Sequence, residues 1–254
     1  MFRTRPLVSL PLGASFRHQL NVALPFRQLA AASVPTTTSR LYATTGASAT
    51  TISEAIKKDH SELTSYYNEI INSNDHDHQE RFGNQFTWEL ARHSVAEELI
   101  VYPAFESHMG KEGHMMAEDD RKAHHRVKEL LKEFQNLKPK QEDQYVPKLK
   151  ELWQELAAHI EDEEANDLPK LEAALQKIEQ QREGGMGQGI SASESMAKKF
   201  GLTKAFVPSR SHPSAGENPY FESAMGMLAA PIDHIADIFR KFPDNTISPN
   251  PSTK

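Results

Sequence analysis

The chain has 254 residues, 38% of them hydrophobic and 25% charged, which is the composition of an ordinary globular protein and excludes a fibrous or wholly disordered chain. Its formal net charge of −6, with no basic stripe in the central region, argues against nucleic-acid binding. No apolar run approaches the ~18 residues of a spanning helix, which argues against membrane insertion, and without cysteine any bound metal must be held by nitrogen and oxygen.

The first fifty residues differ in composition from the rest. No acidic residue precedes Glu54, whereas the segment is rich in Ser, Thr, Ala and Leu and contains five arginines, at positions Arg3, Arg5, Arg17, Arg27 and Arg40. This composition is typical of a mitochondrial transit peptide, and the compact apolar segment of a secretory signal is missing. A disordered basic arm is the alternative. We expect residues 1–45 to be a disordered transit peptide that directs the protein to the mitochondrial matrix, with cleavage near Ala43.

Two amphipathic helices are predicted next. Thr51 and Glu54 form a capping-box pattern, and apolar residues then recur every three or four positions, which predicts a first helix over 51–72. A polar run interrupts the pattern, and a second apolar stripe predicts a helix over 79–108, bent or loosened near its end by Pro103.

Two further helices complete the set. Gly110 and Gly113 separate a third stripe, which predicts a helix over 114–136. A fourth stripe begins after Pro147 and continues to about residue 181, with a possible kink at Pro169. Short connections between four amphipathic helices predict an all-α fold, an antiparallel up-down-up-down four-helix bundle over residues 51–182.

Residues 183–254 are rich in Gly, Ser and Pro, with short apolar patches. We expect an irregular tail with one or two short helices. Its segment 206–213, Phe-Val-Pro-Ser-Arg-Ser-His-Pro, is held extended by its prolines and is expected to wrap over the outside of the bundle as a lid.

Each apolar stripe is interrupted by a histidine where the periodicity requires a hydrophobic residue. A buried polar group without a partner costs about 1–3 kcal/mol, so several of them converging in one core require compensation, and a cation provides it. A single core histidine is usually satisfied without metal, whereas six such side chains on four stripes favour a metal site. The candidate ligands are His60, His93, Glu97, His124, His159 and Glu163.

The spacing of the histidines supports their convergence. They are 33, 31 and 35 residues apart, and near-equal separations return an antiparallel chain to the same height. His93 with Glu97, and His159 with Glu163, are spaced i, i+4 on one helical face. Imidazole and carboxylate ligands suit iron, manganese or zinc, and a glutamate can bridge two ions.

Four motifs lie at these positions: Asp59-His60, His93-Ser-Val-Ala-Glu97-Glu98 before Val101-Tyr102-Pro103, Arg121-Lys-Ala-His124 before Val127-Lys128, and His159-Ile-Glu-Asp-Glu163-Glu164 before Leu168-Pro169. Over roughly half of the chain they resemble the hemerythrin-like (HHE cation-binding) family. The resemblance implies a centre of two non-haem iron ions, with the four histidines as terminal ligands and the two glutamates as bridges; zinc or manganese are alternatives.

One position departs from the oxygen-carrying hemerythrins. They have a second histidine one turn before the third-helix ligand, where this chain has Asp120. Asp120 either adds a carboxylate ligand or leaves an open coordination position. This departure favours sensing, iron handling or redox chemistry over reversible oxygen carriage.

These observations lead to one function hypothesis and two alternatives. The leading hypothesis is a mitochondrial di-iron protein that binds or senses oxygen, nitric oxide or iron by binding and not by turnover. A di-iron oxidase or peroxidase of the ferritin-like kind is the first alternative, although that class uses Glu-x-x-His pairs, which this chain lacks. The second is a bundle with a structural zinc that acts as a docking module.

Overall fold

The computed structural model describes residues 50–182, 189–213 and 219–253, and the expected transit peptide lies outside them. Within these ranges the chain is helical, without a β-strand. The helices are α1 (Ile52–Ile71), α2 (His76–Ala96), η1 (Glu97–Val101), α3 (Tyr102–Phe134), α4 (Tyr145–Asp162), η2 (Glu163–Asp167), α5 (Leu168–Arg182), α6 (Ala192–Lys204), α7 (Pro219–Asp237) and η3 (Pro251–Thr253). None of the described helices combines the length and the apolar character needed to cross a membrane.

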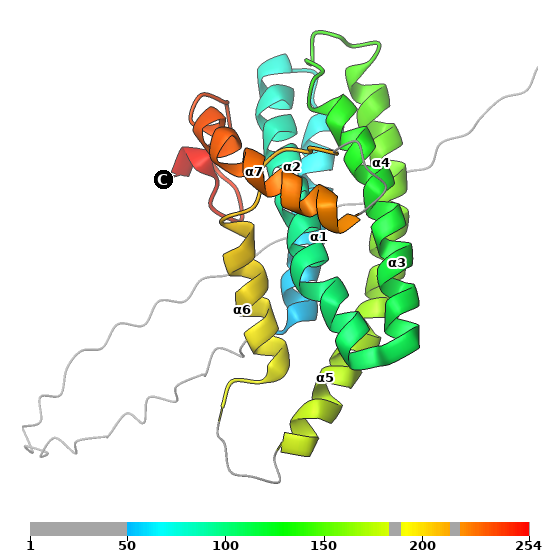
Figure 1. Ribbon diagram of the computed structural model, residues 1–254. Helices are drawn as coiled ribbons and strands as arrows, with labels where there is room; N and C mark the ends of the chain where they lie inside the picture. Colours follow the sequence, from blue (N-terminus) through cyan, green and yellow to red (C-terminus); the bar gives the residue numbers. More distant parts are fainter. Residues whose placement is uncertain (1–49, 183–188, 214–218, 254) are drawn as a thin grey trace, which may run out of the picture. The chain divides into compact units, whose positions relative to one another are not determined.

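The bundle is built from α1 to α5, which lie side by side in Figure 1, with α6 and α7 on its outside. The predicted capping box at the start of α1 is confirmed. Thr51 Oγ1 accepts a hydrogen bond from the Glu54 backbone at 3.1 Å, and Glu54 Oε2 accepts one from the Thr51 backbone at 2.9 Å. These two bonds satisfy amide groups that the first helical turn leaves without partners.

Two predicted boundaries differ from the structure. The polar run before residue 79 was expected to be a loop, but α2 begins at His76, because the Asp75 side chain accepts a hydrogen bond from the Asp77 backbone and caps the helix. The predicted second and third helices meet at a single residue, Gly110, whose φ of 59° bends α3 into two arms. Gly113 lies inside the second arm, where an added Cβ would lie only 2.0 Å from the Phe105 carbonyl oxygen.

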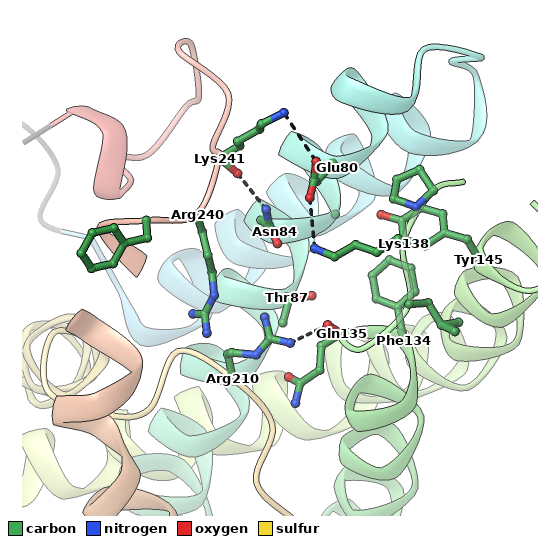
Figure 2. Close-up of a pocket in the computed structure, with 14 residues that line it drawn as sticks. Glu80, Asn84, Thr87, Phe134, Gln135, Lys138, Tyr145, Arg210, Arg240 and Lys241 are labelled. Carbon is green, nitrogen blue, oxygen red and sulfur yellow. Dashed lines mark hydrogen bonds and ion pairs between the residues drawn. The ribbon is translucent and has the colours of Figure 1, made fainter. Parts of the chain in front are cut away.

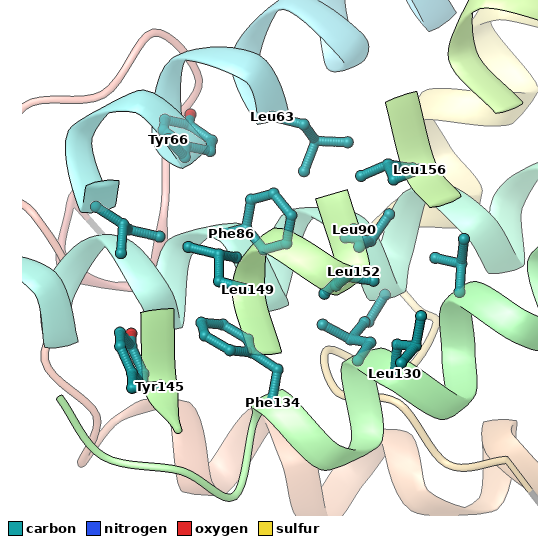
Figure 3. Packing of buried hydrophobic residues seen from close by; sticks show 14 residues of the cluster. Leu63, Tyr66, Phe86, Leu90, Leu130, Phe134, Tyr145, Leu149, Leu152 and Leu156 are labelled. Carbon is teal, nitrogen blue, oxygen red and sulfur yellow. The ribbon is translucent and has the colours of Figure 1, made fainter. Parts of the chain in front are cut away.

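Two apolar clusters fill the bundle. One lies toward the α3–α4 connection and contains Phe86, Phe134 and Leu152 (Figure 3). The other lies toward the Gly110 bend and contains Tyr102 and Leu171. Burial of these large side chains is the main favourable contribution to folding.

A polar layer separates the two clusters. On α1, His60 lies between Ile56 of one cluster and Leu63 of the other. The other three helices repeat this order, with Leu90 and Ala96 flanking His93, Val127 and Ala117 flanking His124, and Leu156 and Leu168 flanking His159. All four histidines are buried, so the fold places one polar layer between two apolar ones.

The two predicted kinks have a specific form. Each is a five-residue π-helical segment, η1 starting at Glu97 and η2 at Glu163, in which the backbone amide five residues after the glutamate bonds to its carbonyl. After one intervening residue, each segment is followed by a proline, Pro103 or Pro169. A proline has no N–H and clashes with the carbonyl of an α-helical turn, so a wider turn before it accommodates the ring. Both helices therefore continue past their prolines.

The described part of the tail contains two long helices, α6 with 13 residues and α7 with 19. The segment between them, residues 205–213, follows the outside of the bundle. Ser211 Oγ donates to the Lys128 carbonyl at 2.6 Å, and Gln135 exchanges two hydrogen bonds with the Ser211 backbone. The segment thus ties α7 to α3, and we call it the strap.

Candidate metal centre

The six predicted ligands meet in the polar layer. The histidines come from α1, α2, α3 and α4, and the two glutamates are the first residues of η1 and η2. All six side chains are buried. The His60 and His93 rings lie 4.9 Å apart, and the His124 and His159 rings 4.6 Å apart, so the imidazoles form two pairs.

Glu97 lies between the two pairs. Its Oε1 is 3.2 Å from His93 Nε2, and its Oε2 is 3.3 Å from His124 Nε2. Two groups with metal-ligand spacing result, and they share this one carboxylate. They consist of His60, His93 and Glu97, and of Glu97, His124 and His159. A carboxylate whose two oxygens face two ligand sets has the geometry of a bridge.

Glu163 is the second central carboxylate. One of its oxygens is 3.4 Å from His60 Nε2. Neither Glu163 nor Glu97 has a hydrogen-bond partner at either side-chain oxygen, and Nε2 of His60 and of His93 has none either. Burial raises the pKa of both glutamates well above the usual value, and a nearby carboxylate adds to this in each case, Glu163 for Glu97 and Asp120 for Glu163. These orphaned polar atoms fit divalent cations, because each is a buried atom of a kind that binds metal.

The histidines are equally suited to cation binding. Burial lowers the pKa of all four, that of His60 to about 3. They are therefore neutral at physiological pH, which is the form that binds metal. Nε2 of His124 and of His159 are 2.9 Å apart, a contact that only a shared proton or a cation makes favourable.

A carboxylate lies behind each imidazole. The outer Nδ1 atoms of the four rings face Asp59 for His93 at 3.2 Å, Glu164 for His60 at 2.8 Å, Glu98 for His124 at 3.5 Å and Asp120 for His159 at 3.8 Å. Such partners orient a metal-binding ring and increase its basicity.

Glu98 and Glu164 are next to the central glutamates in the sequence. Glu164 is half-buried on His60. Glu98 is buried against His124 and Lys128. Although burial opposes it, these two contacts hold the pKa of Glu98 down at about 2, so this carboxylate is charged.

Asp120 combines features of a metal ligand and of a group that supports a ligand. It is buried, and its Oδ2 has no hydrogen-bond partner, while Oδ1 faces His159. Burial and the nearby Asp167 raise its pKa to about 8. Its Oδ2 is a further candidate metal ligand, whereas the contact of its Oδ1 to His159 is that of a supporting group.

Lys204 is a functional residue that sequence reasoning missed. It ends α6, is buried, and pairs with Asp59 at 2.5 Å and with Glu89. Through Asp59 it acts on His93. The sequence carried one signal for it, namely Glu89, an acidic residue within a buried stretch of α2.

Tyr102 was also not recognised as part of the site. Its hydroxyl lies 3.0 Å from His124 Nε2, and its side chain is fully buried. Its place in the Val-Tyr-Pro motif was the only indication.

A third group with ligand spacing lies outside the core, formed by Glu106, His114 and Glu118. The guanidinium of Arg121 already donates to both of its carboxylates, at 2.8 Å and 2.7 Å. This cluster is therefore an ion-pair network on the surface.

Comparison with known proteins agrees with this geometry. The hemerythrin HHE cation-binding domain model matches residues 51–171. An uncharacterized hemerythrin-like protein of Schizosaccharomyces pombe is 47% identical over 194 residues, which cover 76% of this chain and 89% of the relative. No solved structure matches significantly. With its layer of buried histidines and glutamates, the chain belongs to the hemerythrin-like (HHE cation-binding) family.

Proposed function

We propose that this metal-binding protein holds two non-haem iron ions and uses them to bind or sense a small diatomic ligand, oxygen or nitric oxide, or iron itself, in mitochondria. The observation that carries the proposal is Glu97, whose two orphaned oxygens each face a different histidine pair. One carboxylate shared by two ligand sets favours two ions over one.

The ligand set is compatible with iron, and the family resemblance favours iron over the alternatives. Imidazole and carboxylate ligands suit iron, manganese and zinc, and iron supplies redox chemistry when bound. The residues of this chain supply a dry, preorganised site. His60 and His93 would hold one ion, and His124 and His159 the other, with Glu97 and Glu163 between them.

The surroundings favour binding over turnover. The apolar cluster around Tyr102 closes one side of the polar layer, and the cluster around Phe86 closes the other. The Tyr102 hydroxyl is the neutral polar group next to the His124 pair, placed to donate a hydrogen bond to a small ligand there. Such a site suits a ligand of two or three atoms, not an extended substrate.

The mitochondrial part of the proposal rests on the composition of residues 1–45, which contain five arginines and no acidic residue.

The experiment is metal analysis by mass spectrometry on the full chain, paired with absorption spectra in air and without oxygen. About two irons per chain, with near-ultraviolet bands that change with oxygen or nitric oxide, are expected. One zinc per chain and an oxygen-insensitive spectrum would contradict the proposal and favour a structural ion.

A further inference from the structure

The polarity of α7 is inverted. The side of the helix that faces the bundle carries Ala230, Asp233 and Asp237, all buried. Its outer side, with the turn that follows, carries five large apolar side chains. We call them the α7 stripe: Leu228 (71% exposed), Ile232 (71%), Ile235 (61%), Ile238 (75%) and Phe239 (84%). A surface helix of a soluble domain normally has the opposite arrangement.

Hydrogen bonds from the strap determine which side of α7 faces inward. Asp233 accepts from the Arg210 backbone at 3.2 Å and from His212 Nε2 at 2.8 Å. Asp237 accepts from Ser209 Oγ at 2.7 Å. Turning the apolar side inward would break these three bonds and leave two buried carboxylates without partners. The stripe is therefore exposed because the hydrogen bonds of Asp233 and Asp237 hold the opposite side of α7 inward. An exposed apolar patch of this size marks an interaction surface.

A basic cavity adjoins the stripe. It has a volume of about 450 Å³ and lies between α2, the end of α3, the strap and the chain after α7 (Figure 2). Phe239 belongs both to the stripe and to the cavity wall. The charged side chains of the wall are four cations and one carboxylate: Lys138, Arg210, Arg240, Lys241 and Glu80.

The cations are only partly neutralised. Lys138 and Lys241 share Glu80, at 3.0 Å and 3.6 Å, and Lys241 also contacts Asp77. The Arg210 guanidinium donates to the carbonyl of Gln135, a neutral group.

The two arginines keep the cavity basic. Burial and the neighbouring Arg240 lower the pKa of Arg210 to about 10, which still leaves it charged at neutral pH. Arg240 pairs with Asp237. In Figure 2 Arg240 extends toward Arg210, whose guanidinium is directed toward Gln135. Two neighbouring cations are stabilised by an anion that contacts both.

We propose that the α7 stripe and this cavity together form a docking surface for a membrane that contains anionic phospholipid. The apolar side chains would enter the boundary between headgroups and acyl chains, and the basic cavity would take a lipid phosphate. This is attachment to a surface, without insertion across the bilayer.

Charge distribution favours a membrane of this kind. The whole chain has a net charge of −6, and five of its arginines but no acidic residue lie before residue 46, so residues 46–254 are more acidic still. An anionic bilayer would repel most of its surface. Between Leu228 and Lys241, however, both carboxylates are buried beneath α7, and the cations Arg240 and Lys241 follow the stripe. The stripe is thus the place where an acidic protein can approach an anionic surface.

A second copy of the chain fits less well. The stripe extends over twelve residues, a length of roughly 17 Å at the rise of a helix. One helix face of that length is small beside the ~800 Å² that each partner of a stable dimer contributes. An amphipathic helix at a membrane needs no such area.

The test is sedimentation of the full chain with vesicles of phosphatidylcholine alone or mixed with phosphatidylglycerol. We expect binding to the mixed vesicles that weakens with salt, and a loss of about tenfold or more in Ile235→Glu. Ile190→Glu is the matched control, since Ile190 is 58% exposed before α6, and it should bind as the wild type does. The arginine-rich residues 1–45 are present in every variant, so differences between variants report the stripe.

The cavity is tested separately with Lys138→Gln combined with Lys241→Gln. Each lysine is expected to account for about a fivefold change in binding to the anionic vesicles. The control is Lys198→Gln combined with Lys199→Gln, which removes the same charge from the exposed face of α6.

Three results would overturn the proposal. One is wild-type protein that stays in solution with the mixed vesicles, and another is Ile235→Glu that binds as tightly as Ile190→Glu. The third is a dimer in light scattering that Ile235→Glu converts to a monomer, because a second copy then covers the stripe. An unchanged helical spectrum and metal content in Ile235→Glu separates each result from a failure of the metal centre.

Discussion

Glu97 is the residue on which the two halves of the metal centre depend. Its position at the first residue of η1 directs one oxygen to His93 and the other to His124. A shorter or neutral side chain would leave the two imidazole pairs without a shared anion. The consequences for metal binding should therefore be larger than for any single histidine.

Replacing Glu97 with Ala is expected to remove most of the bound metal while the helical circular dichroism spectrum is retained, because the two apolar clusters remain intact. Metal content per chain, measured by mass spectrometry, checks this. His125→Ala is the control, since His125 neighbours a ligand but is exposed. Full metal retention in Glu97→Ala would refute the bridging role.

The buried carboxylates also predict how the metal-free protein responds to pH. In the folded chain the pKa of Asp120 is about 8, against 3.8 without the fold, and the pKa values of Glu97 and Glu163 are raised as well. The folded state thus holds more protons than the unfolded state, so stability falls as pH rises toward 8. The lowered histidine pKa values act in the opposite direction, but only below about 6.5.

The melting temperature of metal-free protein is accordingly expected to fall between pH 6.5 and pH 8, whereas metal-loaded protein, whose carboxylates are neutralised by the cation, should change little. Asp120→Asn should reduce the fall. A melting temperature of the metal-free protein that is constant across this range would contradict the assigned burial of these groups.

At the level of helices, one motif is used twice. His-x3-Glu-Glu-x4-Pro occurs at His93 to Pro103 and again at His159 to Pro169. In both copies the π-helical segment begins at the first glutamate and ends before the proline. The motif therefore places two equivalent glutamates on helices that run in the same direction through the bundle, and this explains why both lie at the same level of the core, between the two apolar clusters.

The helix α6 covers the outer side of the same layer. Lys204 neutralises Asp59 and Glu89, and the Phe200 ring lies 6.0 Å from the His93 ring. Although burial opposes it, the two carboxylates raise the pKa of Lys204, so the lysine is charged. Part of the tail thus belongs to the metal domain, in addition to the lid role expected for it.

Lys204→Met should destabilise the protein by about 3 kcal/mol, because it leaves the buried Asp59 without its cation and Glu89 with only Arg92, at 3.7 Å. It should also weaken metal binding by about tenfold, since Asp59 loses its fixed position behind His93. Urea denaturation and metal competition measure the two effects. Lys199→Met, on the exposed side of α6, should change neither, and equal behaviour of the two variants would show that α6 does not support the site.

For the whole molecule, the proposed location depends on residues 1–45. When this segment is fused to a fluorescent reporter, it is expected to direct the reporter to mitochondria. An arginine-rich segment without acidic residues has the composition of a mitochondrial transit peptide. The same segment with its five arginines changed to glutamine is the control and should leave the reporter in the cytosol. Cytosolic fluorescence of the unmodified fusion would refute the transit role.

Much of the bundle and of its inner layer was predictable from local pattern. The 3.6-residue periodicity of apolar side chains is a property of the sequence itself, because side chains that avoid water must lie on one face of a helix. The histidines stand out because they occupy core positions of four such stripes. The same pattern predicted which side chains point inward. The family resemblance then implied which of them are terminal ligands and which are bridges.

Other features exist only in the tertiary structure. The π-helical form of the kinks depends on how the proline ring is accommodated against the preceding turn. Lys204 is 145 residues from Asp59, and no local pattern connects them. The α7 stripe is apolar in the sequence and would be assigned to the core. Only the strap, whose hydrogen bonds draw Asp233 and Asp237 inward, turns it to the surface, because a buried carboxylate must be hydrogen-bonded whereas an exposed isoleucine costs little.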